Sequence, residues 1–132
     1  AWGPREIVAH LVDTDCIAFV ERIERIIGED RPYIRSIDPE ARLHAGGYFA
    51  RGLGDLLGAL EEARAAHIPW LRGLGDAALT RTGEHDHAGP ITAADIVHQW
   101  AYHDLQHLRQ LAEALQAPLV ERMGNTRKFY DV

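Results

Sequence analysis

The amino-acid sequence predicts a single all-α domain, because three long segments repeat their apolar residues at the period of a helix and no segment alternates convincingly as a strand does. These segments are residues 1–28, 53–74 and 91–116. The stretches between them are rich in glycine and proline, which punctuate loops. The length suits one domain, 1–132, in which residues 117–132 form a tail.

The first predicted helix starts close to the N-terminus and ends at Gly28. Pro4 suits the first turn, where its missing N–H costs nothing, and glycine is a common helix end. His10 lies at the border of the apolar side, and Asp13 follows one turn on. A single histidine in such a place is more often half-exposed than a metal ligand. Cys16 lies about 120° around the helix from His10, so we assign it neither as a ligand nor as a nucleophile.

The middle of the chain is expected to hold a long connection and a second long helix. The connection, residues 29–51, should contain a short helix from Pro39 to Ala45 and an exposed His44. Pro69 lies inside the second helix and should kink it or end its regular hydrogen bonding one turn earlier. His67 could bind a metal there, but a surface position beside the kink is expected.

Two further segments are predicted to be irregular. Residues 75–90 read as a loop that carries the pair His85 and His87. A metal is possible at such a pair, but histidines in loops rich in glycine and aspartate are usually solvated. In the tail, Phe129 and Tyr130 indicate that the segment packs against something.

The third predicted helix carries the main candidate for a functional site. Thr92 should cap it, with Asp95 as the reciprocal partner in a capping box. His103 and His107 are one turn apart, so their rings lie side by side on one face. Two imidazoles in a dry interior are half of a metal site, whereas the alternative is a pair of core histidines satisfied by hydrogen bonds. One arc of about 80° holds this pair and its apolar neighbours: Ile96, Trp100, His103, His107 and Leu111.

Charge and composition exclude several classes of function. The net charge is −6 and the 14 basic residues are scattered, which argues against a nucleic-acid partner. The single cysteine allows no intrachain disulfide and is compatible with a reducing compartment. No apolar run is long enough to cross a membrane and no secretory signal is visible. We therefore expect a cytoplasmic protein with a small-molecule substrate and no membrane or nucleic-acid partner.

Two motifs resemble those of a known family. The segment from Trp2 to Asp13, WGPREIVAHLVD, is similar to the W-x-x-x-E-I-x-x-H-L-x-D signature of the DinB-like (YfiT-like) superfamily. The segment from His103 to Gln110 is similar to the closing H-x-x-x-H-x-x-Q motif of that superfamily. The resemblance covers most of the chain, from residue 2 to residue 116. This superfamily includes metal-dependent hydrolases and bacterial thiol S-transferases.

The resemblance implies a four-helix bundle that binds one divalent transition metal through His10, His103 and His107. Neighbouring helices lie roughly 8–10 Å apart, so histidines from two helices can reach one metal at about 2.0–2.1 Å per bond. Three nitrogen ligands suit Zn, Ni, Co or Fe, with Zn or Ni as the first choices. Three ligands also leave a position open for water or substrate. Candidates for supporting the ligands or lining the pocket are Asp13, Asp104, Gln110 and Trp100.

One departure from the family concerns the number of long helices. Family members usually have a long helix before the Trp2 motif, and this first helix is apparently missing from the chain, which has only three. Three helices leave an apolar side open, and such a side normally finds a partner. We expect a homodimer that covers it. Alternatives are an additional N-terminal segment, the 31–51 connection, or the tail.

The resemblance further implies a reaction. We expect a metal-dependent transferase that adds a low-molecular-weight thiol, such as bacillithiol or mycothiol, to an electrophile. The alternatives are a metal-dependent hydrolase, a non-catalytic module that binds a metal or a small molecule, and a structural helical protein whose histidines merely pack.

Overall fold

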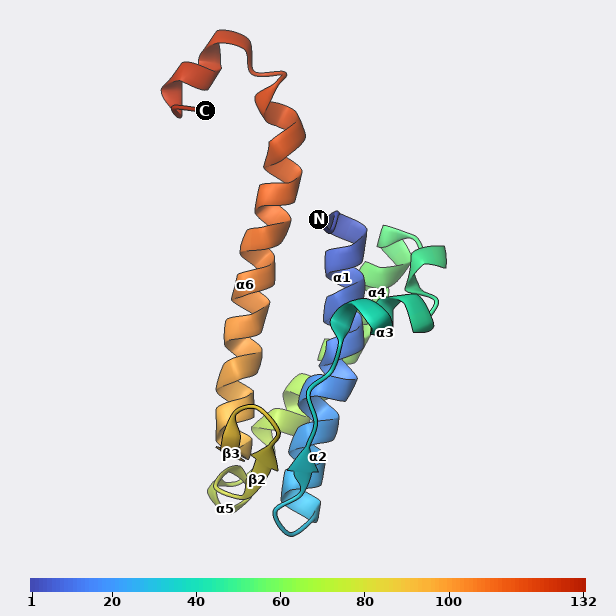
Figure 1. Ribbon diagram of the computed structural model, residues 1–132, viewed down its shortest axis with the longest axis vertical. Helices are drawn as coiled ribbons and strands as arrows, with labels where there is room; N and C mark the ends of the chain where they lie inside the picture. Colours follow the sequence, from blue (N-terminus) through green and yellow to red (C-terminus); the bar gives the residue numbers. More distant parts are fainter.

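The computed structural model describes residues 1–132 and confirms a predominantly helical fold (Figure 1). Helices α1 (Pro4–Thr14) and α2 (Glu21–Gly28) are joined by a π-helical segment, Asp15–Val20, into one continuous rod. The helix expected over residues 1–28 is therefore present, with one wider π-helical stretch that the periodicity did not indicate. The two other long helices, α4 (Leu53–Arg72) and α6 (Ala93–Val120), both pack against α1.

The connection between α2 and α4 follows the prediction closely. It contains α3 (Pro39–Ala45), whose N-terminus is capped by the carboxylate of Asp38, and a 3-10 turn at Tyr48–Ala50. His44 is exposed. Helix α4 continues past Pro69 and ends at Arg72, so it does not end one turn before the proline as one of the two expectations had it. A proline so close to a helix end removes few hydrogen bonds, so the helix tolerates it.

The expectation of no strands is wrong. Short strands β1 (Tyr33–Ile34), β2 (Thr82–His85) and β3 (Gly89–Thr92) form a sheet in the order β1-β2-β3. β1 pairs in parallel with β2, and β2 pairs antiparallel with β3. The expected loop 75–90 is thus the short helix α5 (Asp76–Leu79) followed by a hairpin. Strands of two to four residues are too short to show an alternating pattern, and their pairing with one another stabilises them instead.

Helix α6 starts where the sequence predicts and ends later. Thr92 and Asp95 form the expected capping box at its N-terminus. The helix continues through Pro118 to Val120, so the irregular tail begins four residues later than expected and holds a 3-10 helix at Gly124–Phe129. The final turns of α6 and the tail extend beyond the rest of the molecule (Figure 1). The aromatic rings near the C-terminus contact each other and are exposed, so the packing surface expected for the tail is not supplied by the rest of this chain: Phe129 and Tyr130.

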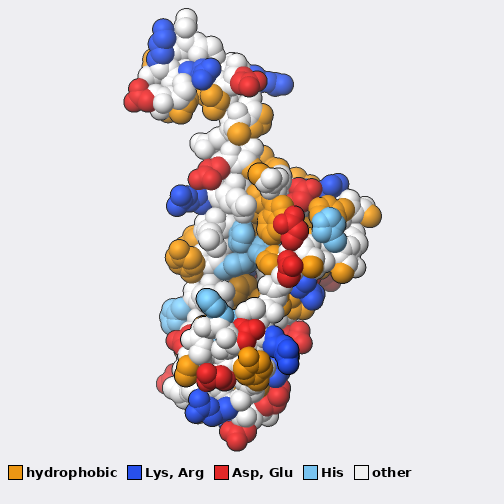
Figure 2. Space-filling model, in the orientation of Figure 1, with side chains coloured by type: hydrophobic (Ala, Val, Ile, Leu, Met, Phe, Trp, Pro, Cys, Tyr) orange, Lys and Arg blue, Asp and Glu red, His pale blue; other side chains and the backbone are white.

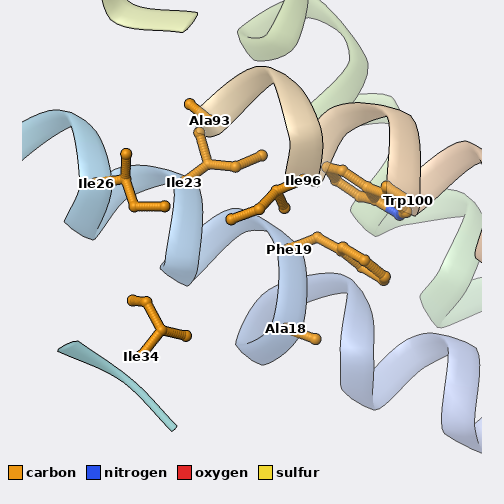
Figure 3. Close-up of a cluster of buried hydrophobic side chains, with 8 residues drawn as sticks. All are labelled: Ala18, Phe19, Ile23, Ile26, Ile34, Ala93, Ile96 and Trp100. Carbon is orange, nitrogen blue, oxygen red and sulfur yellow. The ribbon is translucent and has the colours of Figure 1, made fainter. Parts of the chain in front are cut away.

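The main core lies where the rod, the sheet and the first half of α6 meet (Figure 3). The rings of Phe19 and Trp100 stack at its end, with centroids 5.1 Å apart and planes inclined by 6°. A smaller cluster joins α1, α3 and α4 through Val8, Ala9, Leu43 and Leu56. The first cluster thus holds α6 against the rod, and the second holds α3 and α4 against α1. No helix in the structure combines the length and hydropathy that crossing a membrane requires.

Helices α4 and α6 keep several large apolar side chains exposed. Each of the following is more than one third exposed: Leu53, Leu57, Ile68, Leu105, Leu108, Leu115 and Leu119.

Candidate metal centre

Three histidines from two helices converge near the middle of the molecule. His10 of α1 meets His103 and His107 of α6, and one nitrogen atom of each ring lies within 4.8 Å of the others. The Nε2 atoms of His10 and His103 are 3.0 Å apart. Figure 2 shows histidine side chains gathered between α6 and the rest of the molecule. The structure thus brings together the three residues that the resemblance named as ligands.

The two helices place these rings by simple geometry. His103 and His107 share a face of α6 because they are one turn apart, and their ring centroids lie 4.4 Å from each other. The core directs that face toward α1, where the His10 ring packs 4.6 Å from His107. Trp2 and Phe19 enclose the cluster, with centroids 5.0 Å from His10 and 5.1 Å from His103 respectively.

The electrostatics keep at least two of the rings neutral. Burial is the main cause that lowers the pKa of His10, and together with the nearby rings of His107 and His103, and against a raising effect of Asp13, it brings this pKa to about 4. Burial also lowers the pKa of His103 to about 4, with His107 as the next cause. A neutral imidazole is the form that binds a metal, so these rings need not lose a proton at pH 7 to do so.

The hydrogen-bonding inventory of the cluster fits a metal better than a packed core. The Nδ1 atoms of His10 and His103 are buried with no hydrogen-bond partner, and their Nε2 atoms face each other. Core histidines satisfied by hydrogen bonds would need partners that these rings lack. Two nitrogens bound at about 2.0–2.1 Å to one ion lie roughly 2.9–3.4 Å apart, which matches the Nε2 separation. The donor set therefore fits a divalent transition metal.

The residues expected to support the ligands behave differently from one another. Gln110 accepts a hydrogen bond from the Nδ1 of His107 at 2.7 Å, which orients this ring with its Nε2 free for the cluster. Asp104 makes no hydrogen bond to a ligand histidine, which corrects the expectation that it supports one. It instead accepts two bonds from the Arg64 guanidinium, both at 2.7 Å.

The carboxylate of Asp13 is also occupied. It is 6% exposed and accepts hydrogen bonds from the Arg42 guanidinium at 2.7 and 3.1 Å and from the Tyr48 hydroxyl at 3.1 Å. These contacts join α1 to α3 and to the following turn. Asp13 therefore acts next to His10 through its charge and not through a hydrogen bond to the ring.

A buried polar network beside the histidines was missed by sequence reasoning. Asp15 is fully buried and accepts hydrogen bonds from Arg64 at 2.6 Å and from the Nδ1 of His67 at 2.5 Å. Because Arg64 also holds Asp104, one guanidinium joins the rod, α4 and α6 next to His103. His67 is 17% exposed, so its expected surface position is wrong. Asp15 is the first residue of the π-helical segment. Its hydrogen-bond partners lie about 50 residues away, so no periodic pattern in the sequence indicates them.

The aromatic residue expected in the pocket belongs to the core instead. Trp100 is 5% exposed, stacks on Phe19, and lies under the Arg64 guanidinium at 5.5 Å. The hollow beside the histidines has a volume of about 340 Å³ and is lined on its aromatic side by Trp2 and Phe19. Its remaining walls come from the rod, from α6, and from Ile37 and Pro39 of the connection, with Arg22 as the one lining residue that carries a full charge.

The other histidines and the cysteine do not join the cluster. His85 accepts hydrogen bonds from two backbone N–H groups of the hairpin turn, and the pair His85 and His87 forms no metal-binding group. His98 donates to the carbonyl of Ala94 and is exposed. Cys16 is exposed to solvent, but partial desolvation of its thiol together with nearby acids raises its pKa, which disfavours the nucleophilic form.

Comparison with known proteins places this geometry in context. The family model described as the DinB superfamily matches residues 1–111. A solved structure described as "YfiT from Bacillus subtilis is a probable metal-dependent hydrolase with an unusual four-helix bundle topology" superposes with a TM-score of 0.76 and 25% sequence identity. The match covers 94% of this chain and 68% of that chain. No curated protein sequence matches significantly.

The depressed pKa values predict how stability depends on pH in the metal-free protein. Between pH 6.5 and pH 4 the unfolded chain protonates its histidines while the folded His10 and His103 stay neutral, so stability falls as the pH is lowered through this window. One pKa unit corresponds to about 1.4 kcal/mol, so His10 alone should contribute a loss of roughly 3 kcal/mol. Urea unfolding at graded pH measures it. The loss should shrink in His10→Gln and persist in His98→Gln; identical pH profiles for wild type and His10→Gln would contradict the assignment.

Proposed function

Because the chain belongs to the DinB superfamily, we propose that it is a metal-dependent enzyme that transfers a low-molecular-weight thiol to a small electrophile. The observation that carries the proposal is the cluster of three histidine rings at the wall of a hollow. His10, His103 and His107 would hold the ion, and Gln110 would keep the His107 ring in place.

A divalent metal held by the three histidines would supply the chemistry that makes a nucleophile available at neutral pH, because it would stabilise the anion of a thiol or of water. The chain contributes the rest of the site. Trp2 and Phe19 exclude water from one side of the cluster. The hollow leaves the other side accessible to a small molecule.

The disposition of the acids supports a thiol as the nucleophile. Asp13 is held by Arg42 and Tyr48, and Asp104 is held by Arg64. No aspartate or glutamate lines the hollow, so no carboxylate is free there to accept or return a proton. Hydrolysis of an amide or ester benefits from such a group, whereas a thiol that has lost its proton needs none to attack an electrophilic carbon.

A second candidate is metal-dependent hydrolysis. The description of YfiT from Bacillus subtilis as a probable metal-dependent hydrolase favours it. A module that binds a metal or a small molecule without catalysis would use the same residues, and the experiments below separate these outcomes.

Metal binding should require all three histidines. His10→Ala should lower the affinity for Zn²⁺ or Ni²⁺ by more than about 100-fold, since even a group that only supports a ligand is commonly worth roughly 10- to 100-fold. Competition with a chromophoric chelator measures the affinity of protein purified without a nickel column, and circular dichroism checks that helicity is retained. His98→Ala is the matched control because His98 is exposed on the same helix as His103. Loss of metal in His98→Ala with retention in His10→Ala would show that the site is misassigned.

The reaction assay is conjugation of a generic electrophile by bacillithiol, mycothiol, glutathione or cysteine. Wild type should show a metal-dependent rate with at least one thiol, and His103→Ala should lose it because the nucleophile is no longer activated. Thiol-independent hydrolysis without conjugation would favour the second candidate. If neither assay shows a metal-dependent rate, the protein is a binding module.

We also propose that the apolar side of α4 and α6 is covered by a second copy of the chain. Seven large apolar side chains more than one third exposed support this, because a patch of this kind normally has a partner. Light scattering across a dilution series should report a homodimer that dissociates only at low concentration. A folded monomer that binds no hydrophobic dye would contradict it.

A further inference from the structure

The hollow beside the histidines runs along the rod and ends at an arginine. Four residues of the rod line it at a spacing of four: His10, Thr14, Ala18 and Arg22. Residues at this spacing lie along one side of a helix. At about 1.5 Å per residue, the two ends of this row are roughly 18 Å apart between Cα atoms. The small side chain of Ala18 leaves room between them.

Helix α6 forms the facing wall and runs antiparallel to the rod. His107 and His103 lie beside His10, and Trp100 lies beside Phe19. Gln99, which also lines the hollow, therefore belongs to the end that Arg22 occupies. The hollow is thus a groove with three imidazoles at one end and a guanidinium with an amide at the other.

Arg22 is the one fully charged residue in this lining, and it pairs with no carboxylate. Its hydrogen bond goes from one terminal nitrogen to the carbonyl of Arg35 at 2.8 Å, which anchors the side chain and leaves other donors free. Asp86 is close enough to act on it by charge, but that carboxylate accepts from the N–H and hydroxyl of Ser36.

Two other arginines of the domain have the carboxylate partner that Arg22 lacks. Arg42 holds the buried Asp13, and Arg64 holds the buried Asp15 and also Asp104. Burial lowers the pKa of Arg22, as expected for a cation that is partly desolvated with little compensation. Partial burial of an unpaired guanidinium costs free energy, and a ligand that supplies an anion offsets this cost.

We propose that Arg22 binds a carboxylate of the ligand whose reactive group lies at His10, His103 and His107, so that the site selects elongated small molecules with a terminal negative charge. The inference rests on the proposed function for the identity of the reactive end. A carboxylate suits Arg22 better than a phosphate dianion, because one guanidinium flanked by the charges of Asp86 and Glu21 compensates a single negative charge.

The test compares ligands of equal length that differ only in the charged end. Isothermal titration of the zinc-loaded protein with 6-mercaptohexanoate and 6-mercaptohexanol should give roughly tenfold tighter binding of the carboxylate, the value expected for one partly exposed charge-assisted hydrogen-bonded pair. Arg22→Gln should abolish this preference, and Arg22→Lys should retain part of it. Arg25→Gln is the matched control, because Arg25 lies one turn on, pairs with Glu29 and does not line the groove.

A second pair of probes separates this inference from the proposed function. 4-Phenylbutyrate and 4-phenylbutanol carry no thiol, so their comparison does not depend on a metal. If neither mercaptan binds in a metal-dependent way, the proposed function fails, and the phenyl pair still decides the role of Arg22. Preference for the carboxylates that disappears in Arg22→Gln supports the inference. Equal affinity of acid and alcohol in either pair that binds, a preference that survives in Arg22→Gln, or no binding of any of the carboxylates, overturns it.

Discussion

The site depends on one physical constraint, which is that three imidazole rings are held together where their nitrogens have too few hydrogen-bond partners. His10 and His103 face each other through Nε2 and leave both Nδ1 atoms buried and unpaired. Packing alone does not favour such an arrangement, since unpaired buried polar groups cost free energy. A bound metal would use lone pairs that otherwise have no acceptable partner. The unpaired nitrogens that destabilise the metal-free fold are therefore also the atoms that are available to bind an ion.

The rest of the structure keeps these rings in register. The stacking of Phe19 on Trp100 holds α6 at one position along the length of the rod. The Arg64 guanidinium donates hydrogen bonds to both Asp15 and Asp104, and Asp104 is the sequence neighbour of His103. Breaking a buried ion pair from one side typically costs about 3–5 kcal/mol, so this network resists displacement of α4 from the other helices. It also occupies the acids near the site, which leaves the groove lined by neutral groups and one arginine.

The sequence predicted the parts of the fold that depend on local periodicity. The long helices, the short helix at Pro39 and the Thr92 capping box follow from spacing and capping residues within a few positions. The sheet was missed because its strands are too short for a pattern, and because the pairing of β1 with β2 joins residues some 50 positions apart. The polar network was missed for a similar reason: nothing local shows that a π-helical segment buries Asp15 against Arg64 and His67. Arg22 could be recognised as unpaired only from the structure, which gives carboxylate partners to Arg42 and Arg64.

X-ray absorption at the edge of the bound metal tests the central claim most directly. Protein loaded with one equivalent of Zn²⁺ should show about three nitrogen neighbours from imidazole at about 2.0–2.1 Å, with the remaining coordination from light atoms. The imidazole contribution should drop by one ring in His107→Ala. A first coordination sphere that contains a protein sulfur, or one made of oxygens with no imidazole signal, would contradict the account.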